Sequence, residues 1–467
     1  MTDTGSLLRR TADLAIEYLD SMPDRPVMGA HDVGELRRAL VTELPEHGES
    51  PERVVEDLAE IGGRAAVAMA GPRYFGFVIG GSLPPALAAD WLTSAWDQNA
   101  GLYVAGPAAS VVEEAVGAWL LDLFGLPATS GYGLVTGCQM AHFTCLAAAR
   151  QAVLDRAGWD ATARGLFGAP EVEVVAGAEA HSTVHTALQY LGLGRDRVHA
   201  VHADGQGRMR PDHLASVLDG LPVDAPVIVC LQAGNVNTGS FDPMREAIGH
   251  VRRRPGAWIH VDGAFGLWAA VSPRLAALVD GIGGADSWAT DAHKWLNVPY
   301  DSGLAFVADA SAHLNAMAPP QAAYLEYGPE QERDQLFWVP EFSRRARGFT
   351  VYAALRSLGR SGVRELIERC CALAHRMAER LVATPGIEVL NQVVLNQVLV
   401  HFTPPSGGDT DAFTREVIRR VQADGSIWLS GTTWQGRAAM RISVSNWSTT
   451  EADADLAVEA IVRCAQA

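Results

Sequence analysis

Short apolar runs alternate with helix-like segments through the middle of this chain, from about residue 85 onward. Strands with one face in water alternate apolar and polar side chains, whereas strands covered on both faces are almost continuously apolar. The alternation therefore predicts an α/β domain with a mostly parallel central sheet and helices on both faces. Five runs have the length and composition of such covered strands: 172–176, 197–201, 226–231, 257–261 and 303–307.

The opening of the chain has a different pattern. Two helix-like segments, 6–20 and 51–70, are joined by a proline-rich link. Their modest size and apolar faces predict an N-terminal helical arm, residues 1–85, that packs on something else, such as a second subunit.

The end of the chain also differs from the middle. A long helix-like stretch at 350–383 leads to strand-like runs and further helices, which predicts a small α+β domain. A chain of 467 residues is too long for one simple core. We therefore expect three parts, which are the arm at 1–85, a large α/β domain at 86–345 and a small α+β domain at 346–467.

The charge of the chain is strongly negative, with 37 Lys and Arg against 54 Asp and Glu and a formal net charge of −17. Such a charge argues against nucleic acid or an anionic membrane as the main partner. No run reaches the roughly 18 apolar residues that a membrane span needs. The six cysteines lack C-x-x-C and zinc-type spacings, and the first residues lack a secretory pattern. A reduced, cytoplasmic protein is the expectation.

One lysine, Lys294, lies between two strand-like stretches of the segment 286–307, directly after His293 and before Trp295. Burying an isolated ammonium at such a place is costly. The cost is avoided if the amine forms a Schiff base with an aldehyde cofactor. Most lysines in loops are simply exposed. Residues upstream are therefore needed to distinguish an exposed lysine from one that forms a Schiff base.

Two upstream residues fit such a cofactor. Asp262 ends the strand-like run at 257–261, and a carboxylate that contacts a pyridine nitrogen keeps it protonated. His181 follows the first run and so lies at the carboxyl edge of the sheet, where α/β sheets bind ligands and where its ring could stack on a cofactor. The alternatives are an ordinary capping aspartate and a structural histidine. His181 and His185 could also form a metal face, but the carboxylate of the zinc-protease pattern is absent between them.

The segment Thr136–His142 is a candidate phosphate site. A glycine turn at the start of a helix offers free backbone amides and the positive end of the helix dipole to a dianion. His293 is a second candidate contact for phosphate. Asn235 and Asn237 follow another strand-like run, and they either bind the cofactor or serve the turn.

Together these residues resemble the group II amino-acid decarboxylases that depend on pyridoxal 5′-phosphate (PLP), which have the aspartate-aminotransferase fold, PLP fold type I. The resemblance runs from about residue 70 to the end of the chain. Its most specific marks are Asp262 with Ala264 and the string Asp291-Ala-His-Lys-Trp295. Less specific shared blocks are 72–76, 86–92, 113–119, 349–362 and 440–446.

The resemblance implies roles for single residues. Lys294 forms the internal aldimine, Asp262 pairs with the pyridinium and His181 stacks on the ring, and decarboxylation proceeds through a quinonoid intermediate. It also implies a homodimer with interfacial active sites and an N-terminal arm that swaps onto the partner. By the same resemblance Gly137, Cys138, Gln139 and His293 face the phosphate. With the strand-end candidates added, the cofactor site we expect comprises Lys294, Asp262, His181, Ala264, Gly137, Cys138, Gln139, His293, Asn235 and Asn237.

This sequence departs from the family pattern at two places. The phosphate turn reads Cys138-Gln139-Met140 instead of a Ser/Gly-rich turn followed by glutamate, which leaves its side-chain contacts to phosphate open. The family's mobile loop also carries a tyrosine that is thought to protonate the α-carbon. Here that position falls near Asp334, and Tyr324 and Tyr327 lie earlier in the loop.

The missing tyrosine leaves three reactions open. A general acid at the α-carbon gives an amine, which is our first expectation. Without that acid, dioxygen can intercept the carbanion and give an aldehyde, ammonia and hydrogen peroxide. A substrate with a β leaving group would instead undergo β-elimination.

Two other classes of protein compete with the enzyme reading. One is a non-enzymatic protein of the same fold that binds a partner, against which the intact lysine, aspartate and histidine argue. The other is a nucleotide-binding α/β enzyme, but neither G-x-G-x-x-G nor a P-loop follows a strand. The identity of the amino-acid substrate is not readable. Phe77 and Tyr103 are candidates for contact with its side chain and Arg441 for contact with an anionic group, although each also fits the core or an interface.

Overall fold

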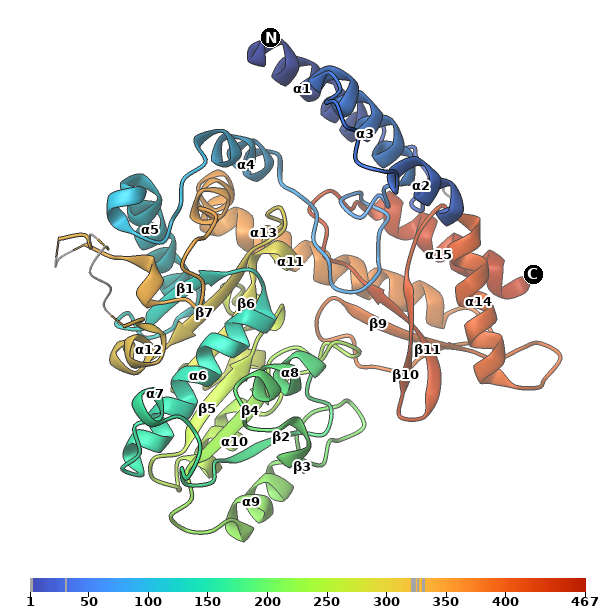
Figure 1. Ribbon diagram of the computed structural model, residues 1–467. Helices are drawn as coiled ribbons and strands as arrows, with labels where there is room; N and C mark the ends of the chain where they lie inside the picture. The colour runs from blue at the N-terminus through green and yellow to red at the C-terminus, as the bar shows by residue number, and fades with distance from the viewer. Residues whose placement is uncertain (1–2, 30–31, 321–324, 326, 330–331) are drawn as a thin grey trace.

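The computed structural model describes residues 3–29, 32–320, 325, 327–329 and 332–467 (Figure 1). A seven-stranded sheet forms the centre of the large domain, with the strand order β1-β7-β6-β5-β4-β2-β3. Strand β7 runs antiparallel to both neighbours, and the other adjacent pairs are parallel. The strands are β1 (Gly131–Val135), β2 (Glu173–Gly177), β3 (Val198–Val201), β4 (Val227–Gln232), β5 (Trp258–Asp262), β6 (Ser287–Asp291) and β7 (Gly303–Val307).

Helices cover both faces of this sheet, and each face has its own hydrophobic core. Val174, Ile228 and Trp258 point into the core under α6 and α8, whereas their neighbours Val175, Val229 and Ile259 point into the core on the opposite face. The strands are therefore apolar on both sides, as predicted. The helices of this domain are α4 (Pro84–Trp96), α5 (Pro107–Phe124), α6 (Cys138–Arg156), α7 (Ala161–Arg164), α8 (Ser182–Tyr190), α9 (Pro211–Gly220), α10 (Met244–Val251), α11 (Ala292–Trp295) and α12 (Ala310–Met317).

The fold class is confirmed as α/β with a small C-terminal α+β domain. That domain has an antiparallel four-stranded sheet in the order β10-β11-β9-β8. Strand β1 does not stand out in the sequence, because two of its five residues are glycines. The small domain contains α13 (Gly348–Val382), β8 (Ile387–Val389), β9 (Gln397–Phe402), α14 (Thr410–Asp424), β10 (Ser430–Trp434), β11 (Arg437–Ser443) and α15 (Glu451–Gln466).

Helix α13 connects the two domains. It packs on α4 and α5 and also on α15 and β9. The helix bends at Gly359, which has a φ of 59° and a ψ of 177°. A left-handed φ is accessible to glycine at low cost, so the bend lies where the sequence permits it.

The N-terminal arm consists of α1 (Thr4–Asp20), α2 (Val33–Leu40) and α3 (Pro51–Ala65). Helix α1 packs on α3, and the arm projects away from both sheets (Figure 1). Every residue of these helices is at least partly exposed. Helix α3 ends at Ala65 rather than at residue 70, because Ala66 is already extended.

The segment after the arm, residues 66–83, runs between the two domains. The amide of Phe75 donates to the carbonyl of Trp428, and the amide of Leu83 donates to the carbonyl of Asn297. Among the described residues, no helix is both long and apolar enough to cross a bilayer. All six cysteines are buried free thiols.

Candidate active site

A cavity of about 400 Å³ opens at the carboxyl ends of β4, β5 and β6, the edge at which α/β sheets bind ligands. It brings together predicted residues from six different segments of the chain. The lining residues are Phe77, Val78, Gly137, Cys138, Gln139, His181, Thr183, Gln232, Gly234, Val236, Asp262, Ala264, Phe265, Asp291, His293, Lys294 and Arg441.

Lys294 lies on the short helix α11, directly after β6. Its Nζ is 2.9 Å from Oδ2 of Asp291, the last residue of that strand. Burial disfavours the ammonium, but the charge and hydrogen bond of Asp291, together with Cys138 and Asp262, outweigh it and raise the pKa of Lys294 above its ordinary value. Lys294 is also the single lysine of the whole chain.

The turn that carries Lys294 is held by contacts from distant segments. A Cβ on Gly80 would lie 1.8 Å from the carbonyl oxygen of Lys294, so only glycine permits this approach. Asn297, with a φ of 55°, accepts from the amides of Gly81 at 2.5 Å and Trp447 at 3.0 Å. Asn297 is not predicted from the sequence, because its only local signal is that asparagine tolerates a left-handed turn.

Asp262 ends β5 and is almost fully buried. Its Oδ1 accepts from the amide of Ala264 at 3.1 Å and lies 3.6 Å from Nε2 of His142. Burial opposes its charge, but His142, His181 and the amide of Ala264 hold the pKa of Asp262 below its ordinary value. The carboxylate is therefore ionised at neutral pH.

His181 directly precedes α8 and caps it. Its Nδ1 accepts from the amide of Thr183 at 3.3 Å and contacts the hydroxyl of that residue at 2.7 Å. Burial lowers the pKa of His181, so the ring is neutral at pH 7. With Nδ1 accepting, the proton is on Nε2, and the cap fixes the plane of the ring.

The start of α6 already binds an anionic group. The amide of Cys138 donates to Oδ1 of Asp291 at 2.6 Å, and Nε2 of His293 lies 3.5 Å from the same oxygen. The carboxylate of Asp291 thus uses donors that a phosphate oxygen would use. A Cβ on Gly137 would come within 3.3 Å of His293. This cradle fits a phosphorylated cofactor, and its backbone donors do not depend on the unusual side chains of the turn.

The thiol of Cys138 points toward His142, with 3.4 Å between Sγ and Nε2. Burial raises the pKa of this thiol well above its ordinary value, so it is neutral. Cys138, His142 and Asp262 bring three ligand types within 4.8 Å of one another. Of these contacts, Cys138 to His142 is within hydrogen-bonding distance of a sulfur, whereas His142 and Asp262 are 3.6 Å apart.

Three predicted residues lie outside this cavity. Asn235 accepts from the amides of Asn237 and Thr238, which is turn chemistry, and Asn237 accepts from the hydroxyl of Thr432. The amide of Tyr103 donates to Asp334. Their contacts with cofactor or substrate stay predictions.

Arg441, on β11, brings a cation from the small domain to the cavity. Its two terminal nitrogens donate to the carbonyl of Val236 at 3.2 Å and to the hydroxyl of Ser430 at 3.5 Å, both neutral partners. Its Nε is buried and has no partner among the described residues. A buried guanidinium with neutral partners is suited to bind an anionic group of a ligand.

Asp334, at the position expected for the loop tyrosine, is buried and fully used. Its two oxygens accept from the amides of Tyr103 at 2.7 Å and Gly328 at 2.9 Å. Tyr327 stacks on Phe337, with ring centroids 5.4 Å apart. Tyr324 lies outside the described residues. Asp334 therefore anchors the loop and is not a free acid.

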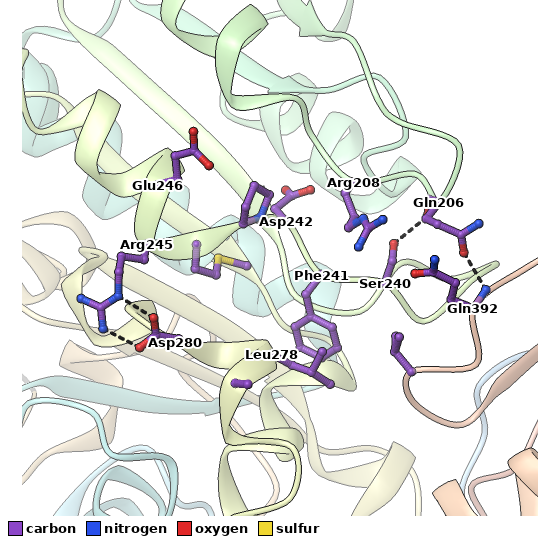
Figure 2. A pocket seen from close by; sticks show the side chains of 14 residues that line it. Gln206, Arg208, Ser240, Phe241, Asp242, Arg245, Glu246, Leu278, Asp280 and Gln392 are labelled. Carbon is purple, nitrogen blue, oxygen red and sulfur yellow. Dashed lines mark hydrogen bonds and ion pairs between the residues drawn. The ribbon is translucent and has the colours of Figure 1, made fainter.

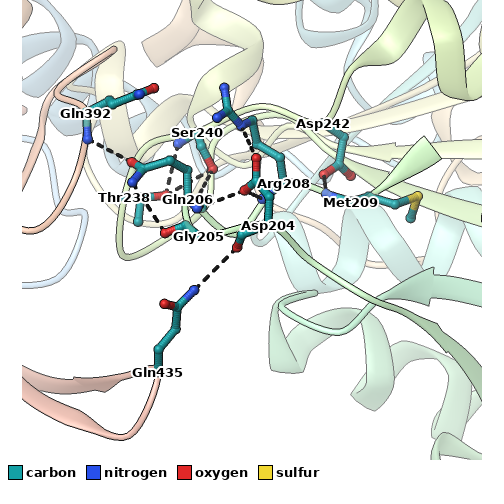
Figure 3. Close-up of polar contacts among 10 residues, drawn as sticks. All are labelled: Asp204, Gly205, Gln206, Arg208, Met209, Thr238, Ser240, Asp242, Gln392 and Gln435. Atoms are coloured by element: carbon teal, nitrogen blue, oxygen red, sulfur yellow. Dashed lines mark hydrogen bonds and ion pairs between the residues drawn. The ribbon is translucent and has the colours of Figure 1, made fainter. Parts of the chain in front are cut away.

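A second cavity, of about 330 Å³, lies where the turn around Gln206 meets the small domain. Figure 2 shows Arg245 facing Asp280, to which it is paired at 2.5 Å. In Figure 3, Gln206 accepts from the amide of Gln392 at 2.7 Å and from the hydroxyl of Ser240 at 2.7 Å. The network ties Gln392 of the small domain to the turn around Gln206 in the large domain.

Comparisons with known proteins agree with this geometry. The family model described as the pyridoxal-dependent decarboxylase conserved domain matches residues 34–403. The aromatic-L-amino-acid decarboxylase of Bacillus atrophaeus is 25% identical over 95% of this chain and 91% of its own length. The 4-hydroxyphenylacetaldehyde synthase of Rhodiola rosea is 26% identical over 92% of this chain and 88% of its own length. In fold, the chain is similar to the crystal structure of Oryza sativa TDC with PLP and tryptamine, with a TM-score of 0.91, 24% identity and coverage of 99% and 98% of the two chains.

Proposed function

This chain belongs to the pyridoxal-dependent decarboxylases, and from this we propose that it removes the α-carboxyl group of an L-amino acid at the cavity around Lys294 and releases an amine. It is a PLP-dependent carboxy-lyase. When bound, PLP supplies an aldehyde for a primary amine and an electron-accepting ring. The observation that carries the proposal is the convergence of Lys294, Asp262, His181 and Arg441 on one cavity.

Lys294 would hold the cofactor through Nζ. A protonated amine does not attack a carbonyl, so Nζ must first give up a proton. Oδ2 of Asp291, 2.9 Å away, favours the protonated amine and so opposes this loss. The amides at the start of α6, with Gln139 and His293 beside them, would hold the phosphate.

Asp262 would face the ring nitrogen of the cofactor. An ionised carboxylate at that nitrogen keeps its proton in place, and the amide of Ala264 fixes the carboxylate. His181 would lie against the ring as a flat neutral surface, because its cap on α8 prevents the imidazole from turning.

Arg441 would bind the carboxylate of the substrate, since the partners of its guanidinium in this structure are neutral. Phe77 lines the same cavity and stacks obliquely on Trp428, with centroids 5.5 Å apart. Its ring would contact the substrate side chain. An apolar or aromatic amino acid is the substrate class that this wall fits.

The experiment is incubation of the purified protein with PLP and a panel of amino acids, with carbon dioxide, amine, ammonia and peroxide measured separately. We expect equal amounts of carbon dioxide and amine. Borohydride reduction should add one cofactor mass to the intact protein. Because Lys294 is the single lysine, the added mass identifies it as the residue that carries the cofactor. Lys294→Arg is the matched negative control. A wild type without the adduct would refute the proposal.

A second outcome is favoured by Asp334, which anchors the loop where a tyrosine is expected. Without a proton donor at the α-carbon, the amino acid, dioxygen and water would give an aldehyde, carbon dioxide, ammonia and hydrogen peroxide. The similarity to a protein named as an aldehyde synthase supports this alternative. Peroxide in equal amount to carbon dioxide would establish it over amine formation.

The partner we propose for the arm is a second copy of this chain. Helices α1–α3 expose apolar side chains, including Leu8 and Leu58, and do not pack on the body of their own chain along their length. Large apolar side chains left exposed on such an arm are suited to an interaction site. A symmetric dimer buries the same surface on both copies.

A further inference from the structure

A row of buried polar side chains begins at His142, beside Asp262, and none of its members lines the cavity. Nδ1 of His142 lies 2.9 Å from Nε2 of His260, and Nδ1 of His260 lies 2.9 Å from the hydroxyl of Ser287. The same hydroxyl accepts from Nε1 of Trp258 at 2.9 Å. All of these side chains are at most 1% exposed.

One direction of hydrogen bonding satisfies both ends of this row. An indole N–H only donates, so Ser287 accepts from Trp258, and its own hydroxyl hydrogen can be donated to Nδ1 of His260. Burial lowers the pKa of both His142 and His260, so each ring has one donor and one acceptor. His260 then donates from Nε2 to Nδ1 of His142, which leaves the remaining proton of His142 on Nε2.

That last proton faces Asp262. The opposite direction would turn a lone pair of His142 toward an ionised carboxylate inside the protein, which is unfavourable. The sulfur of Cys138, 3.4 Å from the same nitrogen, is a neutral and weak acceptor, and a charged acceptor binds a donor about twice as strongly. The 3.6 Å separation from Asp262 is longer than a hydrogen bond, and a movement of about half an ångström would form one.

We propose that His142 is a positioning residue that acts through Asp262: its Nε2–H, oriented by the Trp258–Ser287–His260 chain, serves as a hydrogen-bond donor to the carboxylate and keeps it ionised and aimed at the ring nitrogen of PLP. This inference rests on the role of Asp262 in the proposed function. The electron-accepting power of the cofactor then depends on a core residue that does not line the cavity. The other titratable groups that act on His142 are His181, Asp291 and Lys294.

The test measures the protonation of the ring nitrogen of PLP directly. Protein loaded with PLP carrying 15N in the ring is titrated with acid and base, and the 15N chemical shift reports the protonation of that nitrogen. In His142→Phe, which fills the space but removes the donor, we expect the midpoint of this titration to fall by about one pH unit or more. In His142→Gln, whose amide can still donate to Asp262, the midpoint should stay near that of the wild type.

Two further variants complete the design. Ser287→Ala breaks the chain two steps away and should move the midpoint in the same direction by less, which keeps the test decisive if His142→Phe does not fold. His401→Phe removes another buried histidine, bonded to the carbonyl of Ala438 in the small domain, and should leave the midpoint unchanged.

The outcomes separate this inference from the proposed function. An intact adduct at Lys294 with an unmoved midpoint in both His142→Phe and Ser287→Ala overturns the role of His142 alone. An equal shift in His401→Phe also overturns it, because the effect would then be general destabilisation. A wild type that forms no adduct overturns both proposals.

Discussion

At the scale of single residues, one carboxylate makes two contacts that both affect binding of the cofactor. Asp291 accepts from the amide of Cys138 through one oxygen and from Lys294 through the other. The first contact occupies a donor that a phosphate needs, and the second keeps the lysine protonated. Both contacts work against attachment of the cofactor, so Asp291 sets how readily the site is loaded.

Asp291→Asn should therefore load faster and bind PLP more tightly. Removal of the charge lets the raised pKa of Lys294 fall toward its ordinary value, so more neutral amine is present at a given pH, and repulsion of the phosphate disappears. We expect an association rate at least several-fold higher at pH 7.5, measured by the absorbance of the bound cofactor. Asp219→Asn, an exposed acid on α9, is the control. Weaker binding by Asp291→Asn would show that the carboxylate helps to hold the phosphate.

Arg441→Gln should impair the binding of substrate but not the binding of cofactor. A hydrogen bond to a charged group contributes about 1.5–3 kcal/mol, which corresponds to a rise in KM of roughly 10- to 100-fold. The borohydride adduct at Lys294 should form as in the wild type. A change in kcat with an unchanged KM would contradict this role for Arg441.

At the scale of elements, the turn at α11 depends on the segment that passes over it. Gly80→Ala would place a Cβ 1.8 Å from a backbone carbonyl oxygen, and backbone cannot move aside cheaply. We expect a loss of about 2 kcal/mol or more in the free energy of unfolding and much lower cofactor occupancy. Gly63→Ala, in α3 with open space around it, should be neutral or slightly stabilising. Denaturant unfolding of the two variants makes the comparison, and equal stability would refute the close approach.

Helix α12 contributes an acid-sensitive contact. His313 donates from Nε2 to the carbonyl of Trp338 at 2.8 Å, and burial lowers its pKa to about 3. Between pH 6.5 and 3 the unfolded state therefore binds a proton that the folded state does not, and stability falls as the pH falls through this window. At pH 5 the loss from this residue is about 2 kcal/mol.

His313→Gln keeps a donor but removes the titrating group. Its unfolding free energy should fall less than that of the wild type between pH 7 and pH 5, as measured by urea unfolding at each pH. His375→Gln, an exposed histidine on α13, should follow the wild type. Parallel curves for His313→Gln and the wild type would show that another group carries the acid sensitivity.

The elements also show which parts of the fold and of the site can be predicted from the sequence and which cannot. The covered strands can be predicted because their signal is local, and Lys294, Asp262 and His181 can be predicted because each lies at the end of a strand or shortly after it. His142 is not readable, since an isolated histidine in an alanine-rich helix is indistinguishable from a core residue until His260, 118 residues away, is placed beside it. The two contacts of Asp291 cannot be predicted from the sequence for the same reason, because its partner Cys138 comes from another strand–helix unit.

At the scale of the whole molecule, the arm should decide whether the chain is a dimer. Leu8→Glu with Leu58→Glu places charges on exposed apolar positions of α1 and α3. Burial of a leucine contributes about 1.5–3 kcal/mol, so the dissociation constant of the dimer should rise by about two orders of magnitude or more. Sedimentation velocity over a range of concentrations measures it. Val223→Glu, an exposed apolar residue of the large domain, is the control, and an unchanged dimer in the double variant would place the interface elsewhere.

Asn297 has a consequence for the order in which the protein matures. The turn that holds Lys294 is fixed by Ser445 and Trp447, which lie 148 and 150 residues further along the chain. Domains fold in order as a chain leaves the ribosome, so the large domain emerges before the contacts of Ser445 and Trp447 with this turn can form. Vitamin B6 capture is then an event that follows translation of residue 447, and a nascent or prematurely stopped chain would leave the ribosome as an apoprotein.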